Sequence, residues 1–487
     1  CKILGNIILI IVMFLPLTLL SSETWFLENF GGVAFSTALY QLFSPLKGTE
    51  AGLVQSYICE CLLTSLCASA ILCLIYNTIE PMLKKALPEL NSILSKKALS
   101  SLMLIIKSVV LVAFLIAVSV KVYKKAVLIG IPEYIEKVNN SSTIYEVEYR
   151  NPEEVEMEFP DPKRNLLLIY MESMETTYAD IVAGGGKAEN YIPELTKLAE
   201  ENLYFSNDEN LGGANVYAGT SWTMAGLLAS SAGVNYRLPI DGNDADKYSS
   251  FLPGLTCMGD ILEETGYQNY FMCGSDAVFG GRKDFFLQHG NYHIFDYYSA
   301  IEDNVIDPDY KVFWGMEDEK LYKYAKEKLT EIAADGEPFN FTMLTVDTHH
   351  PNGYVCGLCD DKYPEEFANV ISCASKQVNQ FIEWAREQEW YENTTIVIMG
   401  DHLSMKPDFW SDVHGARKVY NCFINVPEGV VAHSTVNREF SAIDMFPTII
   451  ASLGVDIDGE RLGLGTNLFS SEKTLPEKMG STLFNEE

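Results

Sequence analysis

The sequence predicts an α/β protein with membrane helices in its N-terminal part and a largely parallel sheet in the remainder. The first 125 residues hold three long apolar runs. From residue 164 onward, short apolar runs alternate with helical patterns, as in domains whose strands are covered on both faces. We expect a membrane region over 1–125, a connector over 126–163, a globular domain over 164–475 and a tail over 476–487.

The three apolar runs, at 3–20, 58–76 and 102–122, are each close to the roughly 20 residues that span a bilayer core. The first run could also be a cleaved signal sequence. It lacks a clear small-residue cleavage site and is followed by two further runs, which favours a membrane helix. The sequence begins at Cys1 rather than Met, so at least three spans are expected.

The positions of the lysines indicate the orientation of these spans. Short loops rich in Lys stay on the cytoplasmic side, and the loop between the second and third runs holds Lys84, Lys85, Lys96 and Lys97. The third span would then run outward and place the domain outside the cytoplasm. Lysines just beyond the third span oppose this orientation: Lys121, Lys124 and Lys125.

A net charge of −31 excludes nucleic acid as a partner, because phosphate backbones are bound by basic surfaces. An acidic domain also needs a compensating cation to approach an anionic lipid, and a bound divalent metal supplies one.

Apolar runs and helical periodicity predict the elements of the globular domain. The strands are expected at 165–171, 269–273, 339–346 and 394–399, and the helices at 192–202, 258–265, 318–335 and 366–388. The connector is rich in Glu and contains prolines, so we expect it to cross the surface.

Two of these strands run directly into residues that bind metals. The strand at 165–171 leads into Glu172, and the strand at 394–399 leads through Gly400 into Asp401 and His402. Ligands of α/β sheets bind beyond the carboxyl ends of the strands, so these groups can converge. Two carboxylates and an imidazole suit Mn²⁺ or Zn²⁺. Taken singly, each group is more typical of a helix cap or a surface charge than of a metal ligand.

The segment GTSWT at 219–223 precedes an apolar stretch at 224–232. A hydroxyl at a helix start, with backbone N–H groups pointing at it, is placed to receive a phosphate. An ordinary helix cap is the alternative.

Cys356 and Cys359 form a C-x-x-C pair with Cys373 nearby. The three residues predict a zinc knot or a disulfide. An oxidising compartment outside the cell favours the disulfide.

Taken together, the motifs resemble those of the alkaline-phosphatase and sulfatase superfamily. They are Glu172, GTS at 219–221, Asp401-His402, the His349-His350-Pro351 turn, and IDMFP at 443–447 followed by Leu453-Gly454. Within it, the chain resembles the lipoteichoic acid synthase and phosphoglycerol transferase branch, which joins membrane spans to an extracellular sulfatase-like domain. The C/S-x-P-x-R motif of sulfatases is missing from the nucleophile region.

The resemblance implies a sulfatase-like α/β/α catalytic domain in which Glu172, Thr220, Asp401 and His402 bind a metal, usually Mn²⁺, with Mg²⁺ or Zn²⁺ as alternatives. Thr220 is then also the nucleophile. Arg282 fits a phosphate-binding position, and His349 fits the family's H-x-P histidine, although the adjacent His350 leaves the register open by one. Lipoteichoic acid synthases usually carry a Trp where this chain has Gly280.

His414 follows in a loop after the metal motif and is expected to assist as a general acid at the substrate. The implied reaction moves glycerol phosphate from phosphatidylglycerol to a glycan or teichoic-acid-type acceptor at the cell membrane. A phosphoethanolamine transferase and a non-catalytic envelope scaffold or sensor are the alternatives.

Overall fold

A computed structural model describes residues 2–29, 35, 51–86, 95–139, 142–236, 251–410, 413 and 416–486. The chain divides into two compact units, residues 1–35 with 50–136 and residues 36–49 with 137–487.

The first unit is built of long apolar helices. Three of its segments, Ile3–Asn29, Val54–Lys85 and Lys97–Ile129, are long and apolar enough to cross a membrane, which confirms the expected apolar spans. Helix α1 packs against both α4 and α6. The helices are α1 (Lys2–Asn29), α3 (Ala51–Tyr57), the π-helical turn η1 (Ile58–Leu63), α4 (Thr64–Ala86), α6 (Lys96–Ile129) and, at the border of the unit, α7 (Ile131–Asn139).

The second unit contains a six-stranded sheet in the order β4-β3-β5-β2-β6-β7. All neighbouring strands are parallel except β7, which runs antiparallel to β6. The largely parallel sheet predicted from the sequence is therefore confirmed. The strands are β2 (Asn165–Met171), β3 (Gln268–Cys273), β4 (His293–Phe295), β5 (Phe339–Leu344), β6 (Thr394–Gly400) and β7 (Asn421–Ile424).

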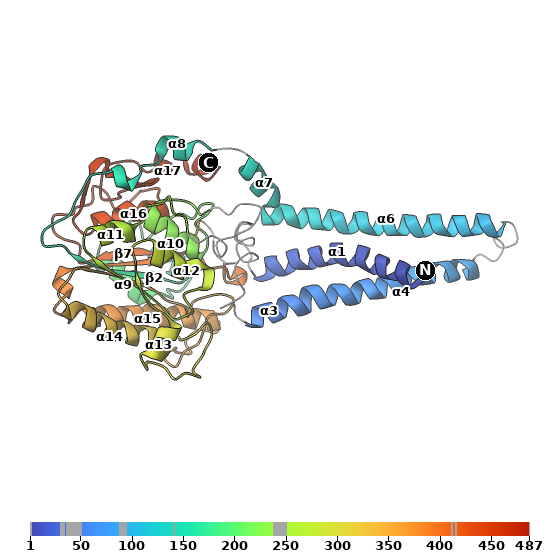
Figure 1. The fold of residues 1–487 in the computed structure, drawn as a ribbon, viewed down its shortest axis with the longest axis horizontal. Helices are drawn as coiled ribbons and strands as arrows, with labels where there is room; N and C mark the ends of the chain where they lie inside the picture. The colour runs from blue at the N-terminus through green and yellow to red at the C-terminus, as the bar shows by residue number, and fades with distance from the viewer. Residues whose placement is uncertain are drawn as a thin grey trace. The chain divides into compact units, whose positions relative to one another are not determined.

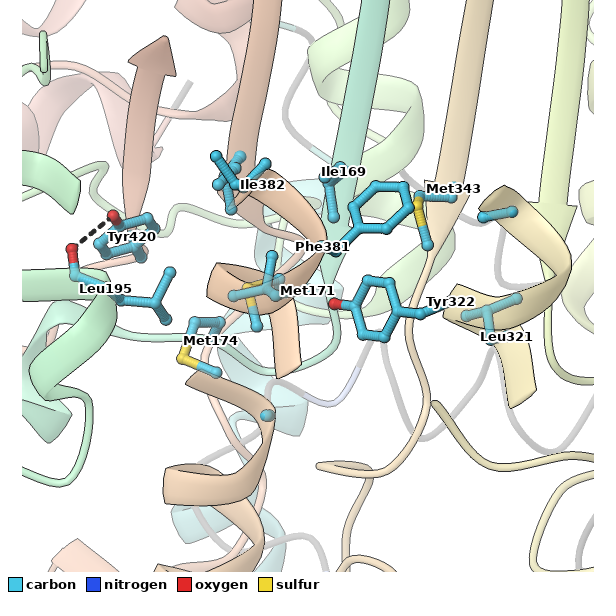
Figure 2. Packing of buried hydrophobic residues seen from close by; sticks show 14 of the residues in the cluster. Ile169, Met171, Met174, Leu195, Leu321, Tyr322, Met343, Phe381, Ile382 and Tyr420 are labelled. Carbon is cyan, nitrogen blue, oxygen red and sulfur yellow. Dashed lines mark hydrogen bonds between the residues drawn. The ribbon is translucent and has the colours of Figure 1, made fainter. Parts of the chain in front are cut away.

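Helices cover both faces of this sheet, so the domain has three layers (Figure 1). On one face, Phe381 and Ile382 of α15 and Tyr322 of α14 pack with Ile169 of β2 and Met343 of β5 (Figure 2). On the other face, Tyr170 of β2 shares a 2.7 Å hydrogen bond with Ser230 of α10. The helices are α8 (Ile144–Glu148), α9 (Pro193–Glu201), α10 (Thr223–Ala232), α11 (Met258–Glu264), α12 (Arg282–Gln288), α13 (Tyr297–Glu302), α14 (Asp318–Ala334), α15 (Glu366–Arg386), α16 (Ala442–Ala451), α17 (Leu475–Met479) and α18 (Ser481–Glu486).

Short elements complete the domain, and some lie in the segment predicted as a connector. β1 (Met157–Glu158) pairs with β8, and Ile144 of α8 is buried in a small apolar cluster. The remaining elements are β8 (Asp456–Ile457), β9 (Arg461–Leu462), β10 (Gly465–Thr466) and the 3₁₀ turns η2 (Pro152–Glu154), η3 (Thr176–Tyr178), η4 (Phe279–Gly281), η5 (Tyr391–Asn393), η6 (Pro407–Trp410) and η7 (Asp458–Glu460).

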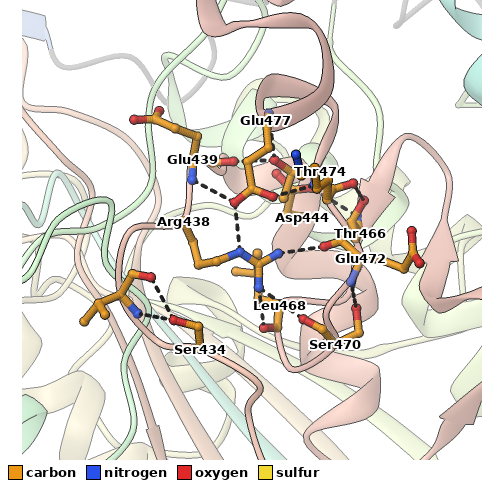
Figure 3. A network of polar contacts seen from close by, with 12 residues as sticks. Ser434, Arg438, Glu439, Asp444, Thr466, Leu468, Ser470, Glu472, Thr474 and Glu477 are labelled. Atoms are coloured by element: carbon orange, nitrogen blue, oxygen red, sulfur yellow. Dashed lines mark hydrogen bonds and ion pairs between the residues drawn. The ribbon is translucent and has the colours of Figure 1, made fainter.

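The C-terminal residues predicted as a tail pack onto the domain. Phe484 is buried against Tyr217 with ring centroids 5.0 Å apart. Arg438, itself buried, donates to Glu477 at 2.8 Å and to the carbonyl oxygens of Leu468 and Glu472, each at 2.9 Å (Figure 3). The described residues up to 486 thus belong to the fold.

Candidate active site

The parallel pairing of β2 with β6 brings the predicted metal ligands to one edge of the sheet. Met171 pairs with Gly400 at the end of the ladder, so Glu172 and Asp401 leave the sheet side by side, with His402 next in the chain. One ligand atom from each of these three residues lies within 4.8 Å of the others, and all three side chains are buried.

Hydrogen bonds orient each member of this group. Asp401 Oδ1 accepts from the backbone N–H groups of Ser173 at 2.7 Å and His402 at 2.8 Å, and the Ser173 hydroxyl donates to Glu172 Oε1 at 2.7 Å. His402 Nδ1 lies 2.7 Å from the Leu403 carbonyl oxygen, to which it donates. His402 Nε2 is then turned to the carboxylates, 3.4 Å from Glu172 Oε1 and 3.5 Å from Asp401 Oδ2. A hydrogen bond from the other ring nitrogen to a backbone carbonyl oxygen is typical of metal-binding histidines.

The charge of the group fits a divalent cation. Burial, and then the charge of Glu172, raise the pKa of Asp401 to about 7. Burial also disfavours the charged form of Glu172, but His349 and His402 outweigh it and hold its pKa below the ordinary value. Asp401 Oδ2 is buried and has no hydrogen-bond partner among the described residues. A bound metal ion would offset the charge of the two carboxylates and would be coordinated by Asp401 Oδ2.

The structure does not bring Thr220 to this group, and this is a correction of the sequence assignment. The Thr220 hydroxyl donates to the Tyr217 carbonyl oxygen and accepts from the Tyr217 N–H, both at 3.0 Å. The hydroxyl that reaches the group belongs to Thr223, whose Oγ1 lies 3.3 Å from Glu172 Oε2 and 3.4 Å from His402 Nε2. The chain turns at Gly219, with a φ of 81°, and α10 starts only at Thr223, so Thr220 stays in the preceding turn.

Close packing of α10 on the β6 terminus places Thr223. A Cβ atom on Gly226, one turn after Thr223, would lie 2.0 Å from the Asp401 carbonyl oxygen. Only glycine allows α10 to approach the backbone at Asp401 this closely. The N-terminal end of α10, with its backbone N–H groups, therefore faces the site.

A pocket joins this group to the predicted substrate residues. It is lined by Glu172, Thr223, Arg282, His349, His350 and His402. Arg282 is buried and donates to the carbonyl oxygens of Phe279 and Asp276, each at 2.9 Å, and to Ser275 Oγ at 3.0 Å. His414 lies outside the described residues.

Both histidines of the H-x-P turn face this pocket, so the structure leaves their register open. Burial lowers the pKa of His349 and lowers that of His350 well below its ordinary value, because an interior position disfavours the charged form of each ring. The His349 ring packs against Trp314, with centroids 4.7 Å apart, and Trp314 also contacts Phe279 at 5.1 Å. Trp314 thus lines the pocket with an aromatic ring beside Gly280. The sequence motifs did not identify Trp314.

An ion pair between Glu175 and Arg417 stabilises the segment that follows His402 through hydrogen bonds to Ser404. Glu175 is fully buried, accepts from the Ser404 N–H at 2.7 Å and pairs with Arg417, which donates from Nε at 2.9 Å. Arg417 also donates to the Ser404 carbonyl oxygen at 2.8 Å. No local sequence pattern predicts this pair, because its members are 242 positions apart.

A three-layer domain with a buried carboxylate and histidine group at the carboxyl end of its sheet, and a threonine hydroxyl beside it, is a metal-binding α/β domain of the transferase and hydrolase type. The chain belongs to the Sulfatase family, which it matches over residues 164–455. The family expected from the motifs is confirmed, and enzymes of this superfamily depend on a metal.

Curated relatives share a third of their aligned residues with the chain. It is 33% identical over 330 residues to phosphoglycerol transferase I of Escherichia coli, and equally to that of Shigella boydii. The alignment covers 66% of this chain and 41% of these proteins, so the chain spans about two fifths of their length. Among solved structures, the lipoteichoic acid synthase LtaP of Listeria monocytogenes has the same fold, with a TM-score of 0.50 and 18% identity over 65% of this chain and 79% of that one.

Proposed function

We propose that this protein is a membrane-anchored phosphoglycerol transferase that moves glycerol phosphate from phosphatidylglycerol to a hydroxyl of a cell-envelope glycan or a teichoic-acid-type acceptor. The observation that carries the proposal is the Thr223 hydroxyl, 3.3 Å from Glu172 and 3.4 Å from His402 at the start of α10. The similarity to phosphoglycerol transferase I supports the choice of the transferred group.

Glu172, Asp401, His402 and the Thr223 hydroxyl would hold the metal ion. Three oxygen ligands and one imidazole suit Mn²⁺, with Mg²⁺ and Zn²⁺ as alternatives. When bound, the cation lowers the pKa of a coordinated hydroxyl and offsets charge on the phosphoryl oxygens.

Thr223 is the nucleophile of the proposed reaction. Its Oγ1 forms a bond to the phosphorus of phosphatidylglycerol, the bond from phosphorus to the diacylglycerol oxygen breaks, and the threonine proton ends on diacylglycerol. An acceptor hydroxyl then attacks the phosphorus of the phosphoglycerol-threonine, the bond from phosphorus to Thr223 Oγ1 breaks, and the proton of the acceptor ends on Thr223. The N-terminal end of α10 favours the negative charge on the phosphoryl group through both steps.

The other pocket residues position the donor. The hydrogen bonds of Arg282 to Phe279, Ser275 and Asp276 fix its guanidinium, so its charge is available to the phosphodiester without a cost in side-chain entropy. His349 is assigned to the glycerol phosphate group, with Trp314 packed against its ring.

The membrane helices keep the site near its lipid donor and raise the effective concentration of that donor. We place the catalytic domain outside the cytoplasm, with several spans in the membrane, because Lys84 and Lys85 lie at the end of the second span and Lys96 and Lys97 lie at the start of the third.

The test is to reconstitute the full chain in vesicles of phosphatidylglycerol with Mn²⁺ and to follow diacylglycerol release and the intact mass of the protein. Release together with a phosphoglycerol adduct is expected. Turnover of phosphatidylethanolamine, but not of phosphatidylglycerol, would replace the proposal with a phosphoethanolamine transferase. Inactivity toward both lipids in a protein that binds metal would support a scaffold.

A further inference from the structure

Three cysteine sulfurs meet in a cluster outside the pocket. Cys356 and Cys359 lie in the segment that follows the H-x-P turn, and Cys373 lies on α15. Cys356 Sγ is 3.7 Å from both Cys359 Sγ and Cys373 Sγ, and all three sulfurs lie within 4.8 Å of one another. A disulfide requires about 2.05 Å, so the disulfide favoured from the sequence is not present in this arrangement, and the cysteines are free thiols.

The separations match the spacing of thiolates around one tetrahedral ion. Zinc binds sulfur at about 2.3 Å, which places two sulfurs of a tetrahedron about 3.8 Å apart. The C-x-x-C spacing and the distant third cysteine are also typical of structural zinc sites.

A buried amide provides a second observation at the same place. Gln377, one turn after Cys373, is 4% exposed, and its Nε2 donates to the sulfurs of Cys373 at 3.4 Å and Cys356 at 3.7 Å. Its Oε1 is buried without a hydrogen-bond partner among the described residues. An N–H donor aimed at two sulfurs suits thiolates, because hydrogen bonds to a charged acceptor are stronger than those to a neutral one.

We propose that Cys356, Cys359 and Cys373 bind one Zn²⁺ as thiolates, at a structural site separate from the metal centre of Glu172, Asp401 and His402. Three thiolates and one divalent cation leave a single negative charge, which the Gln377 amide partly offsets. Within the described part of the chain, no other Cys, His, Asp or Glu joins the cluster, so water or Gln377 Oε1 completes the coordination.

The site ties a loop beside the pocket to a core helix. The loop leaves the pocket at His349, whose carbonyl oxygen accepts from the Gly353 N–H at 3.0 Å, and the Tyr354 N–H donates to the Asp347 carbonyl oxygen at 2.8 Å. Only Val355 separates Tyr354 from Cys356. Zinc would fasten this segment to α15, whose buried residues pack in the core, and so limit movement of the histidine turn.

Metal content and cobalt spectroscopy test the proposal without requiring activity. The full chain is purified under reducing conditions and loaded with Zn²⁺. In the Asp401→Asn variant, which lacks one ligand of the first centre, we expect about one equivalent of zinc to remain bound at the cysteines. Cys359→Ser should lose that equivalent, whereas Cys422→Ala, which removes a buried cysteine elsewhere in the domain, should keep it. Loading with Co²⁺ should give a thiolate-to-cobalt charge-transfer band that persists in Asp401→Asn and is absent in Cys359→Ser.

Thiol alkylation separates zinc from a disulfide. With zinc bound, the three cysteines should resist alkylation until a chelator is added under denaturing conditions, and all three should then react without a reductant. A pair that reacts only after reduction, or a cobalt spectrum without a thiolate band in a Cys422→Ala protein that is folded, would overturn the proposal.

Discussion

The two threonines of the GTSWT segment give the most direct test of the active site, because only Thr223 contacts Glu172 and His402. Thr223→Ala removes the hydroxyl 3.3 Å from Glu172 and leaves no nucleophile at the start of α10. Loss of a nucleophile from a preorganised site costs about 10³- to 10⁶-fold in kcat. We expect diacylglycerol release to fall by at least about 10³-fold and the phosphoglycerol adduct to disappear.

Thr220→Ala is the matched control, with a different expected effect. It leaves the buried N–H group of Tyr217 without the hydroxyl that satisfies it, at a cost of about 1–3 kcal/mol in the free energy of unfolding, whereas the Tyr217 carbonyl oxygen still accepts from the Thr220 N–H at 3.1 Å. Its activity per folded molecule should stay within a few-fold of the parent. Thr223→Ser, which keeps a hydroxyl, should retain measurable release and the adduct.

Initial rates of diacylglycerol release and the intact mass of the protein are measured on the same samples, with urea unfolding to count folded molecules. The reasoning is refuted if Thr220→Ala abolishes the adduct in folded protein while Thr223→Ala keeps it.

Three further changes test the surroundings of the site. Arg282→Lys keeps the charge but loses the planar set of donors, so kcat/KM for phosphatidylglycerol should fall by roughly 100-fold, and an unchanged value would show that Arg282 is not at the phosphoryl group. Burial raises the pKa of Asp444 from 3.8 to about 7, so the folded state keeps a proton that the unfolded chain has released. That contribution to stability is complete below about pH 4 and is lost as the pH rises through about 7. Asp444→Asn, followed by urea unfolding at pH 5 and pH 8, should show a flatter pH dependence than the parent. Arg417→Leu leaves the buried carboxyl group of Glu175 without its ion-pair partner and should lower the free energy of unfolding by about 3 kcal/mol. A second change, Glu175→Gln, should recover part of that loss, and no recovery would argue against the pair as its source.

The central strands and the metal ligands could be predicted because a strand covered on both faces is a continuous apolar run. Such runs marked 165–171 and 394–399, and the structure has strands at Asn165–Met171 and Thr394–Gly400. The convergence of Glu172 with Asp401 then followed from the general rule for the carboxyl ends of parallel strands. This prediction did not depend on the conformation of the loops that connect the two strands.

The sequence assignment chose Thr220 rather than Thr223 because three hydroxyls occur within five residues, and which of them lies beside Glu172 and His402 depends on where the helix starts. Thr223 directly precedes the apolar stretch at 224–232, which was the available signal. The edge strand β4 was not predicted, because a segment of three residues is too short to show an alternation of apolar and polar residues. The packing of Phe484 in the predicted tail depends on Tyr217, 267 positions earlier, and no local pattern encodes such a contact.

The pairing of β2 with β6 also governs when the protein can acquire its metal. Ser173 and Asp401, joined by a 2.7 Å hydrogen bond, are 228 positions apart in the chain. Contacts of such large sequence separation form only after a costly closure of the intervening chain. A newly made chain therefore offers only the adjacent Asp401 and His402, a weak chelator, until the sheet is assembled. The ion is captured by the finished domain and is drawn from whichever compartment the domain completes its folding in.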